Sequence, residues 1–463
     1  MPPAQCRREH RPPIRAHGSV MPTKRKPTAA EKAGDQSLRI LLGWVDGVPW
    51  HAEPFGPILV LGPHRSRRTT GVVIPALRDW PGPALVTSLG GDVAGPTIPD
   101  RAALGGVVAF DPGGLLGDVV ERTRWTPMEQ AREWDQAQVT ARILADSAPL
   151  VPNGDQRWHA AGVALLATHL FAAAANGYGW ADVLRWIDTE EEFEVRSLLQ
   201  ATGMETAIMV AESAWQREAK SRSEIYAELQ VSLGLGWRPG RDEPENRDLI
   251  QNFWEGSAGT LYLCAPLDAR HDYRPYSTAF AWTAIRSGYL NNRGFAASKL
   301  DRHGPEAAIA ASPPRVKPFL VVLDDAADVA PIPDLNDLVS TAGKAAVQVI
   351  SVFTDVAQMQ SVYGGEAALS LVNNHATVVI LPGSRDPATA DLVNRLLRHQ
   401  NPFGEADGLP PAEMVRRLPR GRALAVSRQG PPVILDLDRS PAAAAWQGIA
   451  GLPSGRPGRA AER

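Results

Sequence analysis

Residues 56–77 read G-P-I-L-V-L-G-P-H-R-S-R-R-T-T-G-V-V-I-P-A-L, and this segment is the most informative about the fold. It opens with an apolar run at 57–61, which is typical of a strand buried on both faces of a parallel sheet. Gly62-Pro63 ends the run, and a polar loop follows. Thr69-Thr70 then precedes an apolar segment, and a threonine hydroxyl can cap the unpaired amides of a first helical turn. We therefore predict a strand, a loop and a helix in that order.

Nucleotide-binding proteins hold phosphates at such a turn, with the pattern G-x-x-x-x-G-K-[ST]. Gly62 and Thr69 occupy its first and last places, whereas Arg67 and Arg68 stand where the second glycine and the lysine belong. Glycine lets the backbone turn its amides onto phosphates, and a guanidinium is wider than the point charge of lysine. On this stretch alone, an ordinary strand-turn-helix crossover and a nucleotide-binding loop of altered chemistry are both open.

Size and charge limit the class of protein. A chain of 463 residues, 44% of them hydrophobic, can bury a large core and is expected to form two structural units. The formal charge of −3 is uneven, because residues 1–33 carry a surplus of six positive charges and leave about −9 for the rest. Bulk charge therefore gives no support for a protein that coats nucleic acid. The basic tail, residues 1–36, is expected to be disordered, with an arm touching DNA or anionic lipid as the alternative.

The cysteines and the apolar runs bear on localisation. Cys6 and Cys264 are too few for a disulfide framework, which fits a reducing, cytoplasmic setting. The longest apolar run, 163–175, falls short of the roughly 20 residues that cross a bilayer. The N-terminus also lacks the layout of a signal peptide. We expect a soluble chain without a transmembrane segment, cytoplasmic or peripheral at the inner face of the cell membrane.

Short apolar runs alternate with helical periodicity along the chain. A turn signal at Asp46-Gly47 predicts a hairpin over 38–51. Helical patterns extend from Trp125 to about Ser147 and from Gln156 to Asn176, and residues 180–230 suggest an all-helical insertion. A helix is expected over 277–289, and a loop or linker over 304–318. Such alternation predicts an α/β fold with a mostly parallel sheet, its strands expected at 57–61, 83–88, 106–110, 259–265 and 318–323.

A second informative stretch, P-F-L-V-V-L-D-D at 318–325, ends an apolar strand in two acids. In a phosphate site the first acid, Asp324, can hold Mg²⁺, and the second, Asp325, can orient the water that attacks the γ-phosphate. The alternative is a strand that simply ends in polar loop residues. The phosphate-loop-like stretch upstream, with a helical insertion between the two, favours the nucleotide site.

Several segments together resemble the type IV secretion coupling proteins, the VirD4/TraG/TraD-like ATPases of conjugation. The most specific is L-D-D-A-A-D-V-A-P-I-P-D-L at 323–335, which is similar to the family's L-D-E-F-A-N-L-G-x-I-P-x-L. The likeness covers roughly residues 38–440. The other segments, in the family's order and approximate spacing, are 72–77 with 80–82, 110–112 with 124–128, 357–359 with 363–364, 386–390, 396–397 and 419–424.

The resemblance implies a RecA-like P-loop NTPase domain with a central mostly parallel sheet, and an all-helical insertion that contacts substrate. It also implies hexameric rings, here homo- or hetero-hexamers, that deliver DNA or protein to a secretion channel. The family's N-terminal transmembrane pair is missing, so contact with the membrane-bound machinery is expected to go through a partner. The expected divisions are a basic tail 1–36, the NTPase domain 37–178 and 256–440, the insertion 179–255 and a disordered tail 441–463.

The chain departs from the family at the chemistry of the site. Arg65 and Arg67 replace glycines, Arg68 replaces the lysine, and Asp325 replaces the catalytic glutamate. The family's D-x-K-G-[ED] motif becomes S-L-G-G-D at 88–92, and Thr354 stands in place of a glutamine. An aspartate shortens the reach to the attacking water by about an ångström, which can cost on the order of a hundredfold in rate. The arginines could bind phosphate, enter a neighbour's site, touch DNA or remain solvated loop charges.

The resemblance assigns candidate roles to named residues. ATP would be held by Gly62, Arg67, Arg68, Thr69 and Thr70, Mg²⁺ by Thr69 and Asp324, and Asp325 would be the catalytic acid. Two functions follow from these residues. One is a coupling-protein-like P-loop protein that binds ATP, or retains a degenerate ATP site, and assists substrate delivery to a secretion channel. The other is a non-hydrolysing pseudo-ATPase that assembles with an intact coupling ATPase. Whether the chain hydrolyses ATP stays open at this stage.

Overall fold

The computed structural model describes residues 38–117, 120, 125–147, 156–234, 249–255, 259–295, 305–312, 316–403 and 409–438. The two predicted tails, 1–36 and 441–463, lie outside the described residues.

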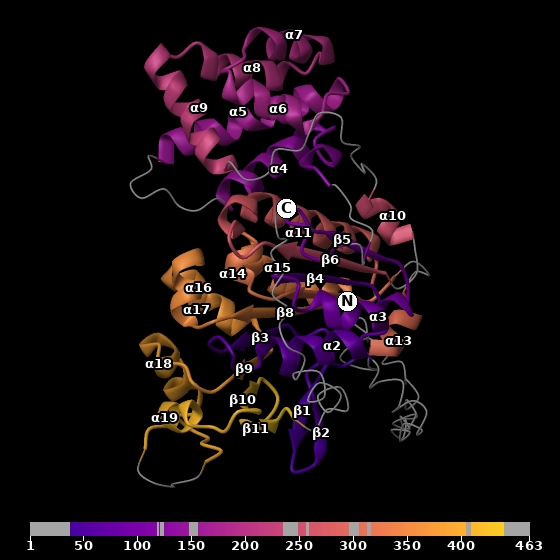
Figure 1. Ribbon diagram of the computed structural model, residues 1–463, viewed down its shortest axis with the longest axis vertical. Helices are drawn as coiled ribbons and strands as arrows, with labels where there is room; N and C mark the ends of the chain where they lie inside the picture. The colour runs from indigo at the N-terminus through magenta and orange to yellow at the C-terminus, as the bar shows by residue number, and fades with distance from the viewer. Residues whose placement is uncertain are drawn as a thin grey trace, which may run out of the picture.

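A single mixed sheet organises the molecule, in the order β2-β1-β11-β10-β9-β3-β8-β7-β4-β6-β5 (Figure 1). The seven strands from β9 to β5 pair in parallel, and the four at the other end pair antiparallel. The α/β fold class predicted from the sequence is therefore confirmed. The strands are β1 (Leu41–Val45), β2 (Val48–His51), β3 (Ile58–Leu61), β4 (Ala84–Leu89), β5 (Val107–Phe110), β6 (Thr260–Ala265), β7 (Phe319–Leu323), β8 (Val347–Phe353), β9 (Thr377–Ile380), β10 (Arg422–Ser427) and β11 (Val433–Asp436).

The central position of β3 in the sheet explains why its sequence is apolar without interruption. Ile58 and Val60 pack into the core on one face of the sheet, whereas Leu59 and Leu61 pack into the core on the other. Because successive side chains of a strand point to opposite faces, a strand covered on both sides needs apolar residues at every position. One face is covered by α2 (Ile74–Asp79), α3 (Ala94–Ala102) and α13 (Pro305–Ala310).

The other face carries α10 (Leu249–Glu255), α11 (Arg270–Asn291) and the later helices, all of which contribute side chains to its core. Figure 1 shows α14 to α17 beside α11, with α18 and α19 near the antiparallel end of the sheet. These later helices are α14 (Ala326–Val329), α15 (Leu335–Thr341), α16 (Val356–Tyr363), α17 (Gly365–Asn374), α18 (Pro387–Leu396) and α19 (Pro411–Arg416).

A separate cluster of helices stands at one end of the molecule, above α11 in Figure 1. Helix α5 lies at its centre and packs against α4, α6, α7, α8 and α9. We propose that this helical cluster begins at α4, earlier than position 179, and that α10 belongs with the sheet, because α10 packs on α11. The members are α4 (Trp134–Asp146), α5 (Gln156–Ala175), α6 (Trp180–Asp188), α7 (Phe193–Thr202), α8 (Glu205–Trp215) and α9 (Ala219–Leu233).

Helix α5 also bears on the question of a membrane span. Its segment Arg157–Ala175 is the one stretch of the described residues that is long and apolar enough to cross a bilayer by length and composition. Just over half of its apolar window, 56%, is buried against protein. The central helix of a packed bundle has the same properties, since it must be apolar on most sides.

Local predictions were right for the strands and less accurate for helix boundaries. The hairpin β1–β2 forms with Asp46 and Gly47 at positive φ, as its turn requires. The helix predicted from Trp125 to Ser147 is instead a 3₁₀ turn at Pro127–Glu129 followed by α4, and the one predicted for 277–289 extends over 270–291. The predicted loop 304–318 was wrong in part, because 305–310 form α13.

Candidate functional site

The two informative stretches of sequence meet at one edge of the sheet. Strands β3 and β7 both pair in parallel with β8, which lies between them. Their carboxyl ends therefore face the same edge, and this is where parallel sheets bind ligands. The Gly62 amide donates to the carbonyl oxygen of Phe353 at 3.2 Å, which ties the loop to the end of β8.

The loop after β3 keeps a glycine-type backbone although two of its residues are arginine. Arg65 has φ of 63° and Arg67 has φ of 79°, both in the left-handed region. This conformation costs a residue with a Cβ about 1–2 kcal/mol. Gly62 is confined as well, since a Cβ there would lie 2.6 Å from Ser66 Oγ and 2.9 Å from Leu381 Cβ. The loop therefore has the backbone conformation that glycine favours, although arginine stands at two of its positions.

The start of the following helix differs from the prediction. A short π-helical turn, Arg68–Val73, precedes α2, and no side chain caps its first amides. The expected threonine cap is therefore wrong. The Thr69 hydroxyl instead donates to Asp324 Oδ2 at 2.8 Å, on the strand end across the site. Thr70, the other predicted ligand of the phosphates, is exposed.

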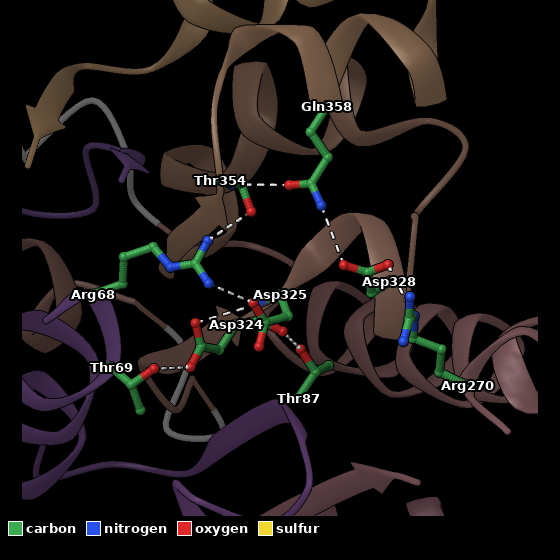
Figure 2. Close-up of polar contacts among 9 residues, drawn as sticks. All are labelled: Arg68, Thr69, Thr87, Arg270, Asp324, Asp325, Asp328, Thr354 and Gln358. Atoms are coloured by element: carbon green, nitrogen blue, oxygen red, sulfur yellow. Dashed lines mark hydrogen bonds and ion pairs between the residues drawn. The ribbon is translucent and has the colours of Figure 1, made fainter. Parts of the chain in front are cut away.

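Arg68 lies between the ends of β7 and β8, as Figure 2 shows. Its Nη2 donates to Asp325 Oδ1 at 2.8 Å, and its Nη1 donates to Thr354 Oγ1 at 3.0 Å. The Arg68 side chain is only 7% exposed and that of Asp325 14%. The arginine at the position where a phosphate loop would have lysine is thus paired with the aspartate at the position where the family's pattern would have glutamate.

The two aspartates after β7 lie in an unfavourable environment for negative charge. Asp324 is fully buried, and Asp325 has φ of 48°, a left-handed conformation. Burial, followed by the charge of Asp325, raises the pKa of Asp324 above its usual range. Burial also raises the pKa of Asp325, and the neighbouring Arg68 opposes that shift. Thr87 of β4 holds the end of β7 by donating to the carbonyl oxygen of Asp324 at 2.9 Å.

A third carboxyl group at the site was missed by sequence reasoning. Desolvation, followed by the negative charge of Asp325, raises the pKa of Asp92 to about 6. Asp92 follows Gly90 and Gly91, which both have positive φ and turn the chain after β4 toward the site. The sequence did point to Asp92, because residues 88–92 resemble a family motif that ends in an acid.

A hydrogen-bonded chain continues from Thr354 away from the loop (Figure 2). The Thr354 amide donates to Gln358 Oε1 at 2.8 Å, and Gln358 Nε2 donates to Asp328 Oδ2 at 3.1 Å. Asp328 in turn lies 3.4 Å from Nε of Arg270, at the start of α11. Gln358 and Asp328 were quoted only as part of the resemblance, and spacing alone could not show that they contact each other.

Arg67, Thr69 and Asp324 are the remaining residues predicted to bind ATP or Mg²⁺, and they differ in which contacts they already make. Arg67 forms an ion pair with Asp438, the last residue described after β11. Within the described residues no group of three or more His, Cys, Asp or Glu side chains could hold a metal ion. A hydroxyl and one carboxylate, Thr69 and Asp324, remain as oxygen ligands for Mg²⁺, which accepts few protein ligands when phosphates supply others.

The strand order, the loop with its left-handed residues and the acids facing it define a RecA-like P-loop fold with an attached helical cluster. Residues 318–398 match the family model described as the TraM recognition site of TraD and TraG. No curated protein matches the sequence significantly. Together with the solved structures below, the family match confirms the resemblance to the TraG/TraD/VirD4-like coupling proteins.

Solved structures of the coupling protein TrwB and of VirB4 share this fold over most of the chain. The plasmid coupling protein TrwB with the ATP analogue ADPNP superposes with a TM-score of 0.63 at 18% identity, covering 88% of this chain and 93% of that one. TrwB with ADP and Mg²⁺ gives 0.57 at 19% identity, covering 86% and 90%. VirB4 of Thermoanaerobacter pseudethanolicus gives 0.51 at 11% identity, covering 88% and 97%.

Proposed function

We propose that this chain is a coupling-protein-like subunit of a type IV secretion or conjugation machine, with a nucleotide site that does not turn over ATP. The observation that carries the proposal is the buried ion pair between Arg68 and Asp325. The geometry thus favours the second of the two functions considered above, the non-hydrolysing subunit.

The chemistry of hydrolysis explains why the ion pair matters. A catalytic carboxylate must accept a hydrogen bond from the attacking water, and the loop cation must neutralise charge that develops on the phosphates. Here each group satisfies the other at 2.8 Å. Separating two mostly buried charges is costly, because each would lose its partner in a poorly solvated site. Neither group is therefore free to act on a nucleotide without a rearrangement of the site.

Binding without hydrolysis remains compatible with the same residues. The Thr69 hydroxyl oxygen lies 2.8 Å from Asp324 Oδ2, so both oxygens can reach one Mg²⁺ ion. The loop from Gly62 to Thr70 would hold the phosphates, and the side chains of Arg67 and Arg68 would join it only by leaving Asp438 and Asp325. TrwB, which shares the fold, has been crystallised with ADPNP and with ADP and Mg²⁺. In this proposal Asp325 stands in the catalytic position but is held by Arg68.

Nucleotide binding and turnover by the full chain test the proposal. We expect release of phosphate from Mg·ATP to stay at background, whether or not a fluorescent ATP analogue binds. The double variant Arg68→Lys with Asp325→Glu restores the usual residue types and should raise turnover above the parent. Arg196→Lys, in the helical cluster, is the matched control, because its ion pair with Glu212 lies outside the site. Steady turnover by the parent, abolished by Asp325→Asn, would instead establish the chain as an ATPase.

The assembly and its partners follow from the same proposal. The subunit would join a homo- or hetero-hexameric ring and assist delivery of DNA or protein to a channel, in the cytoplasm or at the inner face of the membrane through a partner. Mixing the chain with an intact coupling ATPase and measuring the mass of the complex by light scattering tests this. Absence of any complex larger than the separate proteins would contradict the hetero-hexamer.

A further inference from the structure

A cavity of about 400 Å³ lies between the helical cluster and the helices that follow the site. It is formed where the end of α4 approaches the start of α11 and the segment from α14 to α17. A cavity of this volume is large enough for a small organic ligand. Its lining includes Asp146, Arg274, Pro331, Pro333, Val362 and Leu371.

Arg274 is the charged group that distinguishes this cavity. Its Nε donates to the carbonyl oxygen of Ser147 at 2.9 Å, and its Nη1 makes a longer contact of 3.5 Å with that of Ala327. No carboxylate forms an ion pair with it among the residues that the structure describes. Burial lowers the pKa of Arg274, and the negative charge of the nearby Asp328 opposes that shift. Arg270, one turn earlier on α11, contrasts with it because it pairs with Asp328.

The rest of the lining sets the charge and polarity of a ligand. Among the described residues, Asp146 is the one acid that lines the cavity, and it is already bound to His159 at 2.9 Å. Arg274 is the one Arg or Lys side chain of that described lining, and the nearby Asp328 is already paired with Arg270. A single guanidinium favours a ligand with one negative charge, whereas a phosphate dianion would be better held by two. The prolines with Val362 and Leu371 form apolar walls, which favour an aliphatic portion beside the anionic group.

We propose that this cavity binds a monocarboxylate attached to a small aliphatic group, with the carboxylate on Arg274. Such a group occurs on free aliphatic acids and at the C-terminus of a peptide that ends in an apolar residue. The site is separate from the nucleotide site, and the proposal stands whether or not the chain binds ATP.

Titration calorimetry and saturation-transfer NMR on the full chain test this. The probes are hexanoate, its neutral analogue hexanamide, and acetyl-Ala-Leu with a free or an amidated C-terminus. We expect saturable binding of the carboxylates, with each amide at least about tenfold weaker, because a charged hydrogen bond is lost. Tighter binding of the dipeptide than of hexanoate would identify a peptide end as the ligand, and the reverse order would identify a free acid.

Variants separate a ligand contact from a structural role. Arg274→Gln should weaken hexanoate at least about tenfold, and Arg274→Lys should weaken it less because the charge is kept. Arg286→Gln, on the same helix but not lining the cavity, is the matched control and should bind as the parent does. Equal binding of hexanoate and hexanamide by the parent would overturn the proposal, even if Arg274→Gln failed to fold. Unchanged affinity in a folded Arg274→Gln protein, or no saturable binding by the parent, would overturn it as well.

Discussion

Arg68 and Asp325 form an ion pair at 2.8 Å across the ends of β3 and β7, although 257 positions separate them in the sequence. The pair joins the arginine at the expected lysine position to the aspartate at the expected glutamate position, and each neutralises the charge of the other in a mostly buried place. Replacing either residue should therefore change the contribution of the other to stability.

The coupling between these two residues can be measured in a double-mutant cycle. Arg68→Met should lower the free energy of unfolding by about 2–3 kcal/mol, because it leaves Asp325 unpaired in a mostly buried position. Asp325→Asn in the Arg68→Met background should cost much less than it does in the parent. Urea denaturation of the four proteins gives the coupling energy. A value below about 0.5 kcal/mol would mean that the pair contributes little.

The left-handed backbone at Arg65 leads to a second prediction. Arg65 is exposed with φ of 63°, so its side chain adds strain without burial. Arg65→Gly should be more stable than Arg65→Ala by about 1 kcal/mol, the opposite of the usual order of these residues in helices. Thermal and urea unfolding of both variants measure the difference. An alanine variant as stable as the glycine variant would show that the loop does not hold this conformation in solution.

Close packing at Gly62 leads to a third prediction. Alanine there would place its Cβ 2.9 Å from Leu381 Cβ and closer still to Ser66 Oγ, so the loop or β9 must shift. We expect Gly62→Ala to lower the free energy of unfolding by about 1–3 kcal/mol, as overpacking commonly does. Gly95→Ala in α3 is the control, since nothing lies within 4 Å of its added Cβ. Equal stability of the two variants in urea would contradict the tight turn.

A fourth prediction concerns pH and the helical cluster. Both ring nitrogens of His159 contact carboxylates, Asp146 of α4 at 2.9 Å and Glu228 of α9 at 3.2 Å. These hydrogen bonds and charges outweigh desolvation and raise the pKa of His159. The stabilisation is therefore complete below the unfolded pKa of about 6.5 and is lost as pH rises through the higher folded pKa.

The comparison of the parent with His159→Gln isolates this contribution. The difference in free energy of unfolding between the two proteins should shrink as the pH is raised from 6 to 9. His271→Gln, at an exposed position on α11, should show no such trend. A parent whose advantage over His159→Gln is the same at both ends of this range would mean that the bridge does not depend on protonation.

Much of the architecture could be predicted from local sequence. The apolar runs at β3 and β7 are continuous because both of their faces are covered, and such runs have little alternative to a central parallel strand. The turn at Asp46-Gly47 was equally clear. The boundaries of helices were harder to predict. Helix α11 carries Pro275 in its second turn, and α13 is a short helix within a proline-rich segment. Pro275 is the sixth residue of α11, where it removes an intrahelical hydrogen bond, so local sequence favoured a start after it although the helix begins before it.

Local sequence is enough to place Arg68 after β3 and Asp325 after β7, where the family's pattern has lysine and glutamate. Only the tertiary structure decided that these two side chains bind each other, that Thr69 contacts Asp324 rather than capping its own helix, and that Asp92 faces the same site. The physical reason is that a strand's register and burial follow from its own apolar pattern. Partners across a sheet edge depend instead on how β3, β8 and β7 are ordered, and no local pattern encodes that order.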